Sequence, residues 1–410
     1  MSTSNDGRGV SRRDFFRNAA VGAGAVAVAG MTVAASAAEP PPAAAGTAPA
    51  GATPASAAPA DPGAKKTVAD VLKAAREKLY PRCRVCPECD GVACCGEVPG
   101  MGGIGTGRAF RNNLAALARY DLVMRTFHDV KKPDPAVTLL GQKLSMPILS
   151  GITGGVTYNM GLKGKMTEEE YMEGVIAGCA QAGTLGWAAD GIEDPISVYQ
   201  TRLAMVKKYG GKACAQVKPR SQAEIIERMR LAEDAGARLI AIDIDSAGRA
   251  ARVKPGEVIE PKTVAQLREL ARATKVPFIV KGVMSPDEAE MAVQAGAAGI
   301  VVSNHGGRVL DHTPGVAQVL PAIAEKVKGR IAILADGGVR YGADVLKLLA
   351  LGAQAVLVGR PVLRGAVGGG AEGVALVLNK LREELAAAMV LTGTPDVKKV
   401  SRKVLSTATV

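Results

Sequence analysis

From Ser145 onward, short apolar runs alternate with longer stretches in which apolar residues follow a helical spacing. This alternation is typical of repeated strand–helix units that build a parallel sheet. The apolar runs, each a predicted strand, cover residues 147–149, 184–187, 213–217, 239–242, 277–280, 299–302, 331–334 and 355–358. Eight such units predict an α/β fold of the closed (β/α)8 type, a TIM barrel, rather than an open doubly wound sheet.

The sequence before the barrel lacks this regular pattern. A short helical pattern covers residues 68–79, a cysteine-rich stretch covers 83–95, and a glycine-rich stretch covers 100–107. Because cysteine- and glycine-rich stretches take the place of a periodic apolar pattern here, we expect residues 66–140 to form a short N-terminal cap with a Cys-rich loop. The barrel itself is then expected over residues 141–410.

The N-terminal residues read as a targeting signal. Arg12 and Arg13 precede an uncharged Ala/Gly-rich run over residues 18–38, which contains a small-residue cleavage site at 35–37. The run is short and only weakly apolar, so we favour a signal over a membrane anchor. Residues 1–37 are therefore predicted to be a twin-arginine signal peptide, which would direct the folded protein to the periplasm or cell envelope.

Composition narrows the classes of partner. The formal net charge is +12, yet Lys and Arg are scattered and aromatic residues make up 3% of the chain. This pattern argues against nucleic acid and favours small anionic substrates. Residues 38–65 are mostly Ala, Pro, Gly and Thr and predict a disordered linker. No stretch downstream of the N-terminus looks apolar for long enough to span a membrane.

Polar residues follow the predicted strands at the end where such barrels hold their reactive groups. Asp243 and Asp245 lie at the end of the fourth run, and Lys281 follows the fifth. The last three runs are followed by Ser303-Asn304-His305-Gly306-Gly307-Arg308, by Asp336-Gly337-Gly338-Val339-Arg340 and by Gly359-Arg360-Pro361. We expect these groups to converge on one mouth of the barrel.

His305 is the strongest candidate for a catalytic base among the three histidines. It lies between small residues at a strand end, with Arg308 three positions later. An imidazole can accept a proton near neutral pH, and a guanidinium can hold a carboxylate by a paired hydrogen bond. His128 and His312 lack such a setting and are expected on the surface or in loops.

A phosphate site is indicated after the last two strands. Gly338 and Gly359 allow backbone amides to approach a phosphate closely, and Arg340 and Arg360 add positive charge. One glycine pair is weak evidence, because turns use glycine freely. Two such groups after strands seven and eight occupy the usual phosphate position of this barrel.

From Pro277 to Leu363 these motifs resemble the FMN-dependent 2-hydroxy-acid oxidase and dehydrogenase family, which includes glycolate oxidase, lactate oxidase and mandelate dehydrogenase. Lys281-Gly282-Val283 and Leu310-Asp311 belong to the match, and the Asn-His-Gly-Gly-Arg run is its most specific part. The resemblance implies bound FMN and oxidation of a 2-hydroxy acid to a 2-oxo acid. Electrons would pass to the flavin after proton removal at C2 or as a hydride.

The resemblance also implies residue roles. His305 would be the base, Asp245 would stabilise its protonated form, and Arg308 would bind the substrate carboxylate. Lys281 would lie near flavin N1 and O2, where its charge favours the reduced ring. The remaining cofactor residues would be Gln216 and Ser303 on the pyrimidine edge, Asp243 beside them, Asp336 on the ribityl chain, and Gly338, Arg340, Gly359 and Arg360 on the phosphate.

The chain departs from the family around the substrate. Lys218 stands where the family usually has Tyr, Asp243 stands where it has Thr, and no counterpart of an N-terminal substrate Tyr is evident. Arg249 and Arg252 are both candidates for a second substrate arginine. We expect Lys218 to favour a substrate more anionic or more polar than glycolate, such as a hydroxy dicarboxylate. In the alternative, its side chain points to solvent.

Five of the seven cysteines form a second unusual feature. Cys83, Cys86, Cys89 and Cys94, with Cys95 adjacent, have a spacing that suits an iron–sulfur cluster or zinc. Disulfides are natural in an exported protein, and free thiols are the third alternative. The other two, Cys179 and Cys214, are expected to be plain core residues.

Two further functions are compatible with a flavin barrel. One is an isomerase of the flavin-dependent isopentenyl-diphosphate type, against which the His305 and Arg308 pair argues. The other is a non-catalytic flavoprotein that relays electrons through the cysteine loop. The main hypothesis remains a 2-hydroxy-acid dehydrogenase or oxidase that passes electrons to an acceptor in the cell envelope, without a stable membrane span and as a homo-oligomer.

Overall fold

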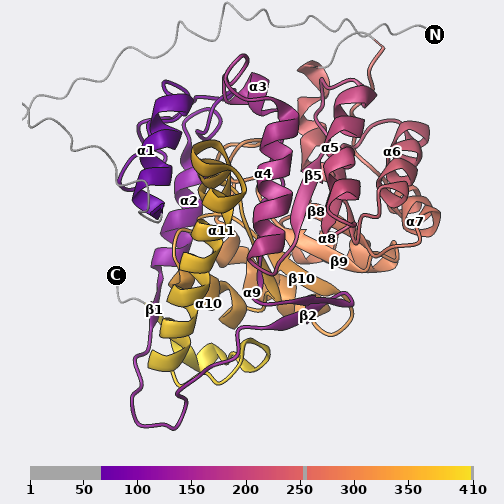
Figure 1. The fold of residues 1–410 in the computed structure, drawn as a ribbon. Helices are drawn as coiled ribbons and strands as arrows, with labels where there is room; N and C mark the ends of the chain where they lie inside the picture. The colour runs from indigo at the N-terminus through magenta and orange to yellow at the C-terminus, as the bar shows by residue number, and fades with distance from the viewer. Residues whose placement is uncertain (1–65, 253–255, 408–410) are drawn as a thin grey trace, which may run out of the picture. The chain divides into compact units, whose positions relative to one another are not determined.

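The structure is a computed structural model that describes residues 66–252 and 256–407. The predicted signal peptide and linker lie outside these residues. Within them, eight parallel strands lie side by side and helices cover their outer surface (Figure 1). The strands are β4 (Ile148–Ser150), β5 (Gly186–Ala189), β6 (Ala213–Val217), β7 (Ile240–Asp243), β8 (Phe278–Val283), β9 (Gly299–Val302), β10 (Ala332–Ala335) and β11 (Ala355–Val358).

The sheet forms a nearly closed barrel. Its strand order is β4-β11-β10-β9-β8-β7-β6-β5, so β4 and β5, the first two barrel strands along the chain, lie at the two edges. These edges meet through the Thr184 hydroxyl, which donates to the Ile148 carbonyl at 2.6 Å, and through the Ser150 amide, which is 3.3 Å from the Leu185 carbonyl. Each predicted apolar run overlaps one strand, and the predicted TIM barrel is confirmed.

The helices follow the strands as expected for this fold. They are α3 (Val156–Asn159), α4 (Glu168–Gln181), α5 (Ile196–Lys208), α6 (Gln222–Asp234), α7 (Val264–Ala273), α8 (Pro286–Gln294), α9 (Val316–Val327), α10 (Gly342–Ala350) and α11 (Arg360–Leu391). Several begin at a capping box, such as Thr167 with Glu170 and Thr263 with Gln266. A 3-10 segment, η1 (Ile244–Arg252), follows β7.

The apolar core has two layers. One lies inside the barrel and includes Leu149, Trp187 and Cys214, and the other lies between the barrel and the helices and includes Cys179. Strands buried on both faces read as continuous apolar runs, which is why the sequence showed them so clearly. Both Cys179 and Cys214 are fully buried, as predicted for core residues.

The region before the barrel packs against it and also joins the two ends of the described chain. It contains α1 (Val68–Leu79), α2 (Arg108–Ala118), β1 (Tyr120–Leu122), β2 (Val137–Leu139) and β3 (Gln142–Leu144). The strand β12 (Leu405–Thr407) pairs antiparallel with β1, after short 3-10 turns η2 (Val397–Lys399) and η3 (Arg402–Val404). Residues near the C-terminus therefore complete the small sheet that begins with β1 of the cap.

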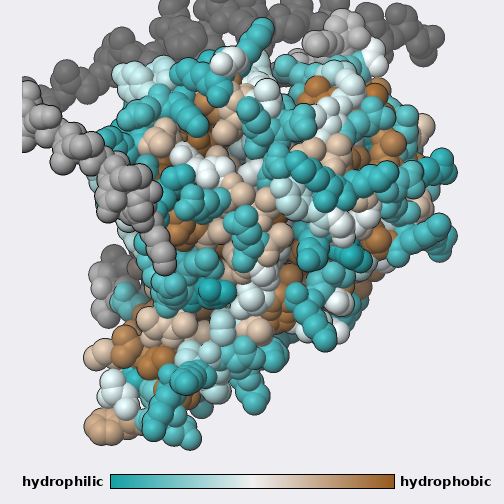
Figure 2. Space-filling model, viewed as in Figure 1, coloured by the Kyte–Doolittle hydropathy of each residue, from teal (hydrophilic) through white to brown (hydrophobic). Residues whose placement is uncertain are grey.

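One helix among the described residues, α11, is long and apolar enough by length and composition to cross a membrane. From the sequence, no stretch this long and apolar was expected downstream of the N-terminus. It is kinked at Gly370, packs against α1 and α4, and buries 56% of its most apolar stretch inside the protein. A core helix meets the same criterion, so this helix is weak evidence for a span. The face in Figure 2 is mostly hydrophilic, with scattered apolar patches.

Candidate active site

The polar residues at the strand ends surround one cavity of about 330 Å³ at the carboxyl end of the barrel. Among its lining residues are Gln216, Lys218, Ser246, Arg249, Lys281, His305, Arg308, Asp336, Gly338, Arg340, Gly359 and Arg360. Three other candidates, Asp243, Asp245 and Ser303, are not in the lining but contact residues that are. The side chain of Arg252 lies outside what the structure describes.

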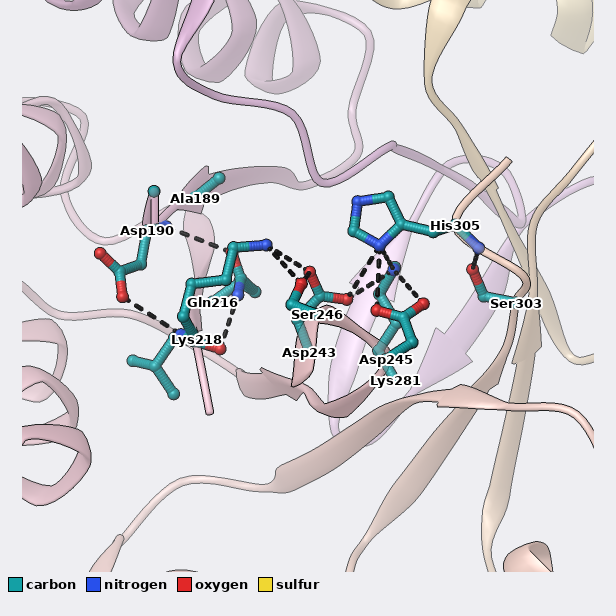
Figure 3. A network of polar contacts seen from close by, with 12 residues as sticks. Ala189, Asp190, Gln216, Lys218, Asp243, Asp245, Ser246, Lys281, Ser303 and His305 are labelled. Atoms are coloured by element: carbon teal, nitrogen blue, oxygen red, sulfur yellow. Dashed lines mark hydrogen bonds and ion pairs between the residues drawn. The ribbon is translucent and has the colours of Figure 1, made fainter. Parts of the chain in front are cut away.

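His305 is held by both its backbone and its ring. Its φ of 58° is unusual for a residue other than glycine, and its amide donates to the Ser303 hydroxyl at 3.0 Å. Nδ1 of the ring lies 2.9 Å from Asp245 Oδ1, while the other ring nitrogen points away from the carboxylates (Figure 3). This arrangement leaves Nε2 as the nitrogen that can exchange a proton with a ligand.

The electrostatic setting of His305 favours a neutral ring. Burial and the nearby Lys281 ammonium lower the pKa of His305, and Asp245 and Asp243 oppose them only in part. A neutral imidazole is the form that can act as a base. Lys281 itself is buried, and although burial favours the neutral amine, the neighbouring carboxylates raise its pKa above the usual value.

Asp243 is fully buried between two lysines. Its Oδ1 lies 2.6 Å from Lys281 Nζ, and its Oδ2 accepts from Lys218 Nζ at 2.5 Å and from the Ser246 hydroxyl at 2.9 Å. Burial alone would raise the pKa of this carboxyl, but the two ammonium groups hold it well below its usual range. Figure 3 shows that these contacts continue through Lys281 to His305 and Asp245.

Three arginines gather beneath the cap and bond to backbone carbonyls. Arg308 Nη1 donates to the Gly100 carbonyl at 2.5 Å, and Arg360 Nε donates to the Met101 carbonyl at 2.8 Å. Arg340 donates to two further carbonyls. Because carbonyl oxygens carry no net charge, the cluster remains positively charged and favours an anion.

The pKa values of two of these arginines reflect the crowded positive charge. Burial and the neighbouring Arg308 and Arg340 lower the pKa of Arg360 to about 9. Burial and Arg249 lower the pKa of Arg308 to about 10. The Arg360 guanidinium also lies 4.0 Å from the centre of the Phe110 ring. A bound anion would relieve this mutual repulsion.

Two buried polar atoms show that the cavity suits FMN. Asp336 Oδ1 and Arg340 Nε have no hydrogen-bond partner among the described residues, although both side chains line the cavity. A Cβ at Gly359 would meet nothing closer than 4.0 Å, so this backbone is open toward a ligand. FMN consists of a ring with a polar edge, a ribityl chain with hydroxyls, and a phosphate. The Asp336 carboxylate suits the hydroxyls, the arginines and the open glycine backbone suit the phosphate, and Gln216 with Lys281 suits the ring edge.

Several residues of the site were not identified from the sequence. Thr153 and Asp190 line the cavity just beyond β4 and β5, and applying the strand-end rule to the first two strands would have found them. The carbonyls of Gly100 and Met101 and the ring of Phe110 come from the cap. No local sequence signal indicates that the cap contacts arginines about 200 residues later.

The cysteine-rich loop lies next to the arginines. The Nη2 group of Arg364 is 3.1 Å from Cys89 Sγ and 3.5 Å from Cys83 Sγ, and Arg340 Nη2 is 3.4 Å from Cys89 Sγ. Burial raises the pKa of the Cys89 thiol, but the surrounding arginines outweigh it and lower the pKa overall. All seven cysteines lie among the described residues, and none of them forms a disulfide there.

The structure does not bring the predicted ligands Cys83, Cys86, Cys89 and Cys94 together as a metal site. Among the described residues, the one group of His, Cys, Asp or Glu ligand atoms that lie close enough together is Asp243, Asp245 and His305. Lys281 Nζ is 2.6 Å from Asp243 and 3.6 Å from Asp245. The lysine ammonium thus already supplies the positive charge in that group.

Comparison with known proteins agrees with this geometry. The family of FMN-dependent dehydrogenases matches residues 101–262 and 249–407. The 2-hydroxyacid oxidase 1 of Homo sapiens is 32% identical over 341 residues, which cover 71% of this chain and 86% of that protein. The glycolate oxidase of Spinacia oleracea is 32% identical over 322 residues, which cover 71% of this chain and 85% of that protein.

A solved structure supports both the fold and the cofactor. A mandelate oxidase variant carrying an FMN adduct superposes with a TM-score of 0.66 at 28% identity, covering 82% of this chain and 98% of that one. The resemblance noted in the sequence is thereby confirmed, as is the expectation of an FMN-dependent oxidoreductase. The chain belongs to the FMN-dependent dehydrogenase family, together with these 2-hydroxyacid, glycolate and mandelate oxidases.

Proposed function

We propose that the protein oxidises a 2-hydroxy acid to the 2-oxo acid with FMN as its cofactor. The observation that carries the proposal is the His305–Asp245 pair at 2.9 Å, which faces a cavity also lined by Arg308. The named relatives act on 2-hydroxy acids, which supports oxidation over the isomerase and electron-relay alternatives.

The residues of this chain have separate tasks in the proposed reaction. Arg308 binds the substrate carboxylate and orients the alcohol carbon toward His305. Nε2 of His305 takes up a proton, and Asp245 stabilises the imidazolium that results. FMN, when bound, would supply the oxidising chemistry by accepting the two electrons and the second proton that the substrate loses. Lys281, Gln216, Asp336, Gly338, Arg340, Gly359 and Arg360 are the residues that would hold it.

The test is anaerobic mixing of the FMN-loaded protein with a panel of 2-hydroxy acids. We expect the visible absorbance of the oxidised flavin to bleach with at least one acid, and the matching 2-oxo acid to form in equal amount. A flavin that none of the acids reduces, in a protein that binds FMN tightly, would overturn the proposal.

We further propose that the protein works in the periplasm or cell envelope and passes its electrons to an acceptor there. The paired arginines Arg12 and Arg13 support export, and export of folded protein suits an enzyme loaded with a cofactor.

A homo-oligomer is also proposed. The side chains of Met124 and Phe127 support it, because they are 72% and 104% exposed in the single chain. Light scattering of the purified protein tests the oligomer.

The cysteine loop is proposed to bind a metal or iron–sulfur cluster, or to form disulfides after export. The support is the spacing of Cys83, Cys86, Cys89 and Cys94, together with Arg364, whose Nη2 lies within 3.5 Å of two of their sulfurs. Binding would require the loop to draw its sulfurs closer together than they lie here. Metal analysis and thiol counting on protein from the envelope fraction distinguish a metal, a disulfide and free thiols.

A further inference from the structure

A lysine and an aspartate at the carboxyl end of the barrel contact each other. Lys218 directly follows β6, and Asp243 is the last residue of the neighbouring strand β7. Their charged groups lie 2.5 Å apart, and Asp243 is fully buried while Lys218 is 9% exposed. The cation and the anion compensate each other, so the pair carries no net charge. The two residues act as one coupled pair.

The ammonium of Lys218 is fixed in place. Of its three N–H donors, one bonds to Asp243 Oδ2 at 2.5 Å and one to the Ser246 hydroxyl at 3.0 Å. The Ser246 hydroxyl in turn donates to the same Asp243 oxygen at 2.9 Å. Because Lys218 also lines the cavity, its third donor is available to a ligand. A lysine held at two points gives up little further rotamer entropy when it binds.

Asp243 has no role of its own at the cavity surface. Both of its oxygens accept from Lys218, Ser246 and Lys281, and the residue is not part of the cavity lining. It therefore acts through the lysines. From the sequence, Asp243 was expected to contact the cofactor, and Lys218 was expected to favour a substrate more anionic or more polar than glycolate, such as a hydroxy dicarboxylate. The ion pair removes the basis for the second expectation.

We propose that Lys218 is a fixed hydrogen-bond donor to an oxygen shared by all 2-hydroxy-acid substrates of this enzyme, and that Asp243, with Ser246, is the residue that positions it. This inference rests on the proposed function. Because Asp243 compensates its charge, the donor adds no net charge to the cavity. It contributes to binding a mono- and a dicarboxylic acid alike and is not a site for a second carboxylate.

The first test uses ligand binding to FMN-saturated protein, followed by the change in the flavin spectrum. The probes are glyoxylate and oxaloacetate, the 2-oxo forms of a monocarboxylic and a dicarboxylic substrate. Lys218→Met should weaken both by a similar factor, on the order of tenfold, because one charge-assisted hydrogen bond is lost. A selective loss of oxaloacetate would overturn the proposal in favour of a second-carboxylate site.

The second test asks whether Asp243 acts through Lys218. Asp243→Asn should weaken the same ligands about tenfold, and the double variant should be no weaker than either single one. Losses that multiply to about a hundredfold would show that Asp243 acts independently and would refute its positioning role. Ser246→Ala is a milder change to the same network. It should raise KM less than either single variant of the pair does, and it should change kcat less than it changes KM.

Thermal unfolding of the same four proteins without ligand separates this inference from the proposed function. A coupled pair predicts non-additive changes in unfolding free energy whatever the substrate is. If wild type reduces with no 2-hydroxy acid yet the unfolding cycle is coupled, the proposed function fails and the ion pair stands. If wild type is active and the unfolding cycle is additive, the pair fails and the function stands.

Discussion

His305 is placed at the end of β9 by a backbone conformation that few residues adopt, and its Nδ1 is committed to Asp245. A base in this position has no evident substitute in the cavity. We expect His305→Gln to keep FMN bound but to slow anaerobic flavin reduction on the order of 10²–10⁴-fold. His312→Ala is the matched control, since that side chain is 61% exposed, and it should reduce at the normal rate. Reduction of the His305 variant at the wild-type rate would refute its role.

The pH profile provides a second test of the same residue. Burial and Lys281 lower the pKa of His305 from its ordinary 6.5, and the base works only when neutral. The value of kcat/KM should therefore fall as the pH drops through a pKa below 6.5. Asp245→Asn removes a carboxylate that raises this pKa, so the acid limb should move to still lower pH while reduction slows. A limb that moved upward in Asp245→Asn would contradict the assignment.

At the scale of elements, the strands and the residues directly after them could be predicted from the sequence. All four residues of β9 are buried, so the strand reads as an apolar run, and His305 follows it within three positions. The carbonyl contacts of Arg308 with Gly100 could not be predicted, because they join segments 208 residues apart. The Lys218–Asp243 pair likewise depends on the register of β6 against β7.

The loop between β11 and α11 carries a prediction about cofactor binding. Gly359 has an ordinary φ of −82°, and an added Cβ would lie 4.0 Å from its nearest neighbour, on Thr153. Gly359→Ala should therefore fold normally but weaken FMN binding roughly tenfold or more, because the methyl group occupies space beside the phosphate. Titration of the apoprotein with FMN measures the loss.

The control for this variant lies within a strand. Gly299→Ala, in β9, introduces a Cβ with its nearest contact at 3.4 Å, and this residue does not line the cavity. It should leave FMN affinity unchanged. If Gly359→Ala bound FMN as tightly as wild type, the phosphate would have to lie elsewhere than at this loop.

At the scale of the whole molecule, the cap closes over the charged end of the barrel. Carbonyls of Gly100 and Met101 meet Arg308 and Arg360, while β12 returns to pair with β1. The position of Arg308 thus depends on residues of the cap, early in the described chain. A barrel cut away from its cap would lose these contacts, so the cap is part of the site as well as of the fold.

The last prediction concerns where the whole chain works. On the proposed export route, Arg12 and Arg13 would be the pair that a twin-arginine receptor reads, and Arg17 lies outside the pair. Replacing both Arg12 and Arg13 by Lys keeps the charge but removes the guanidinium geometry, so export should stop and flavin-loaded precursor should accumulate in the cytoplasm. Arg17→Lys should be exported normally. Cell fractionation with FMN measurement checks this, and continued export of the paired variant would mean that a different signal directs the protein.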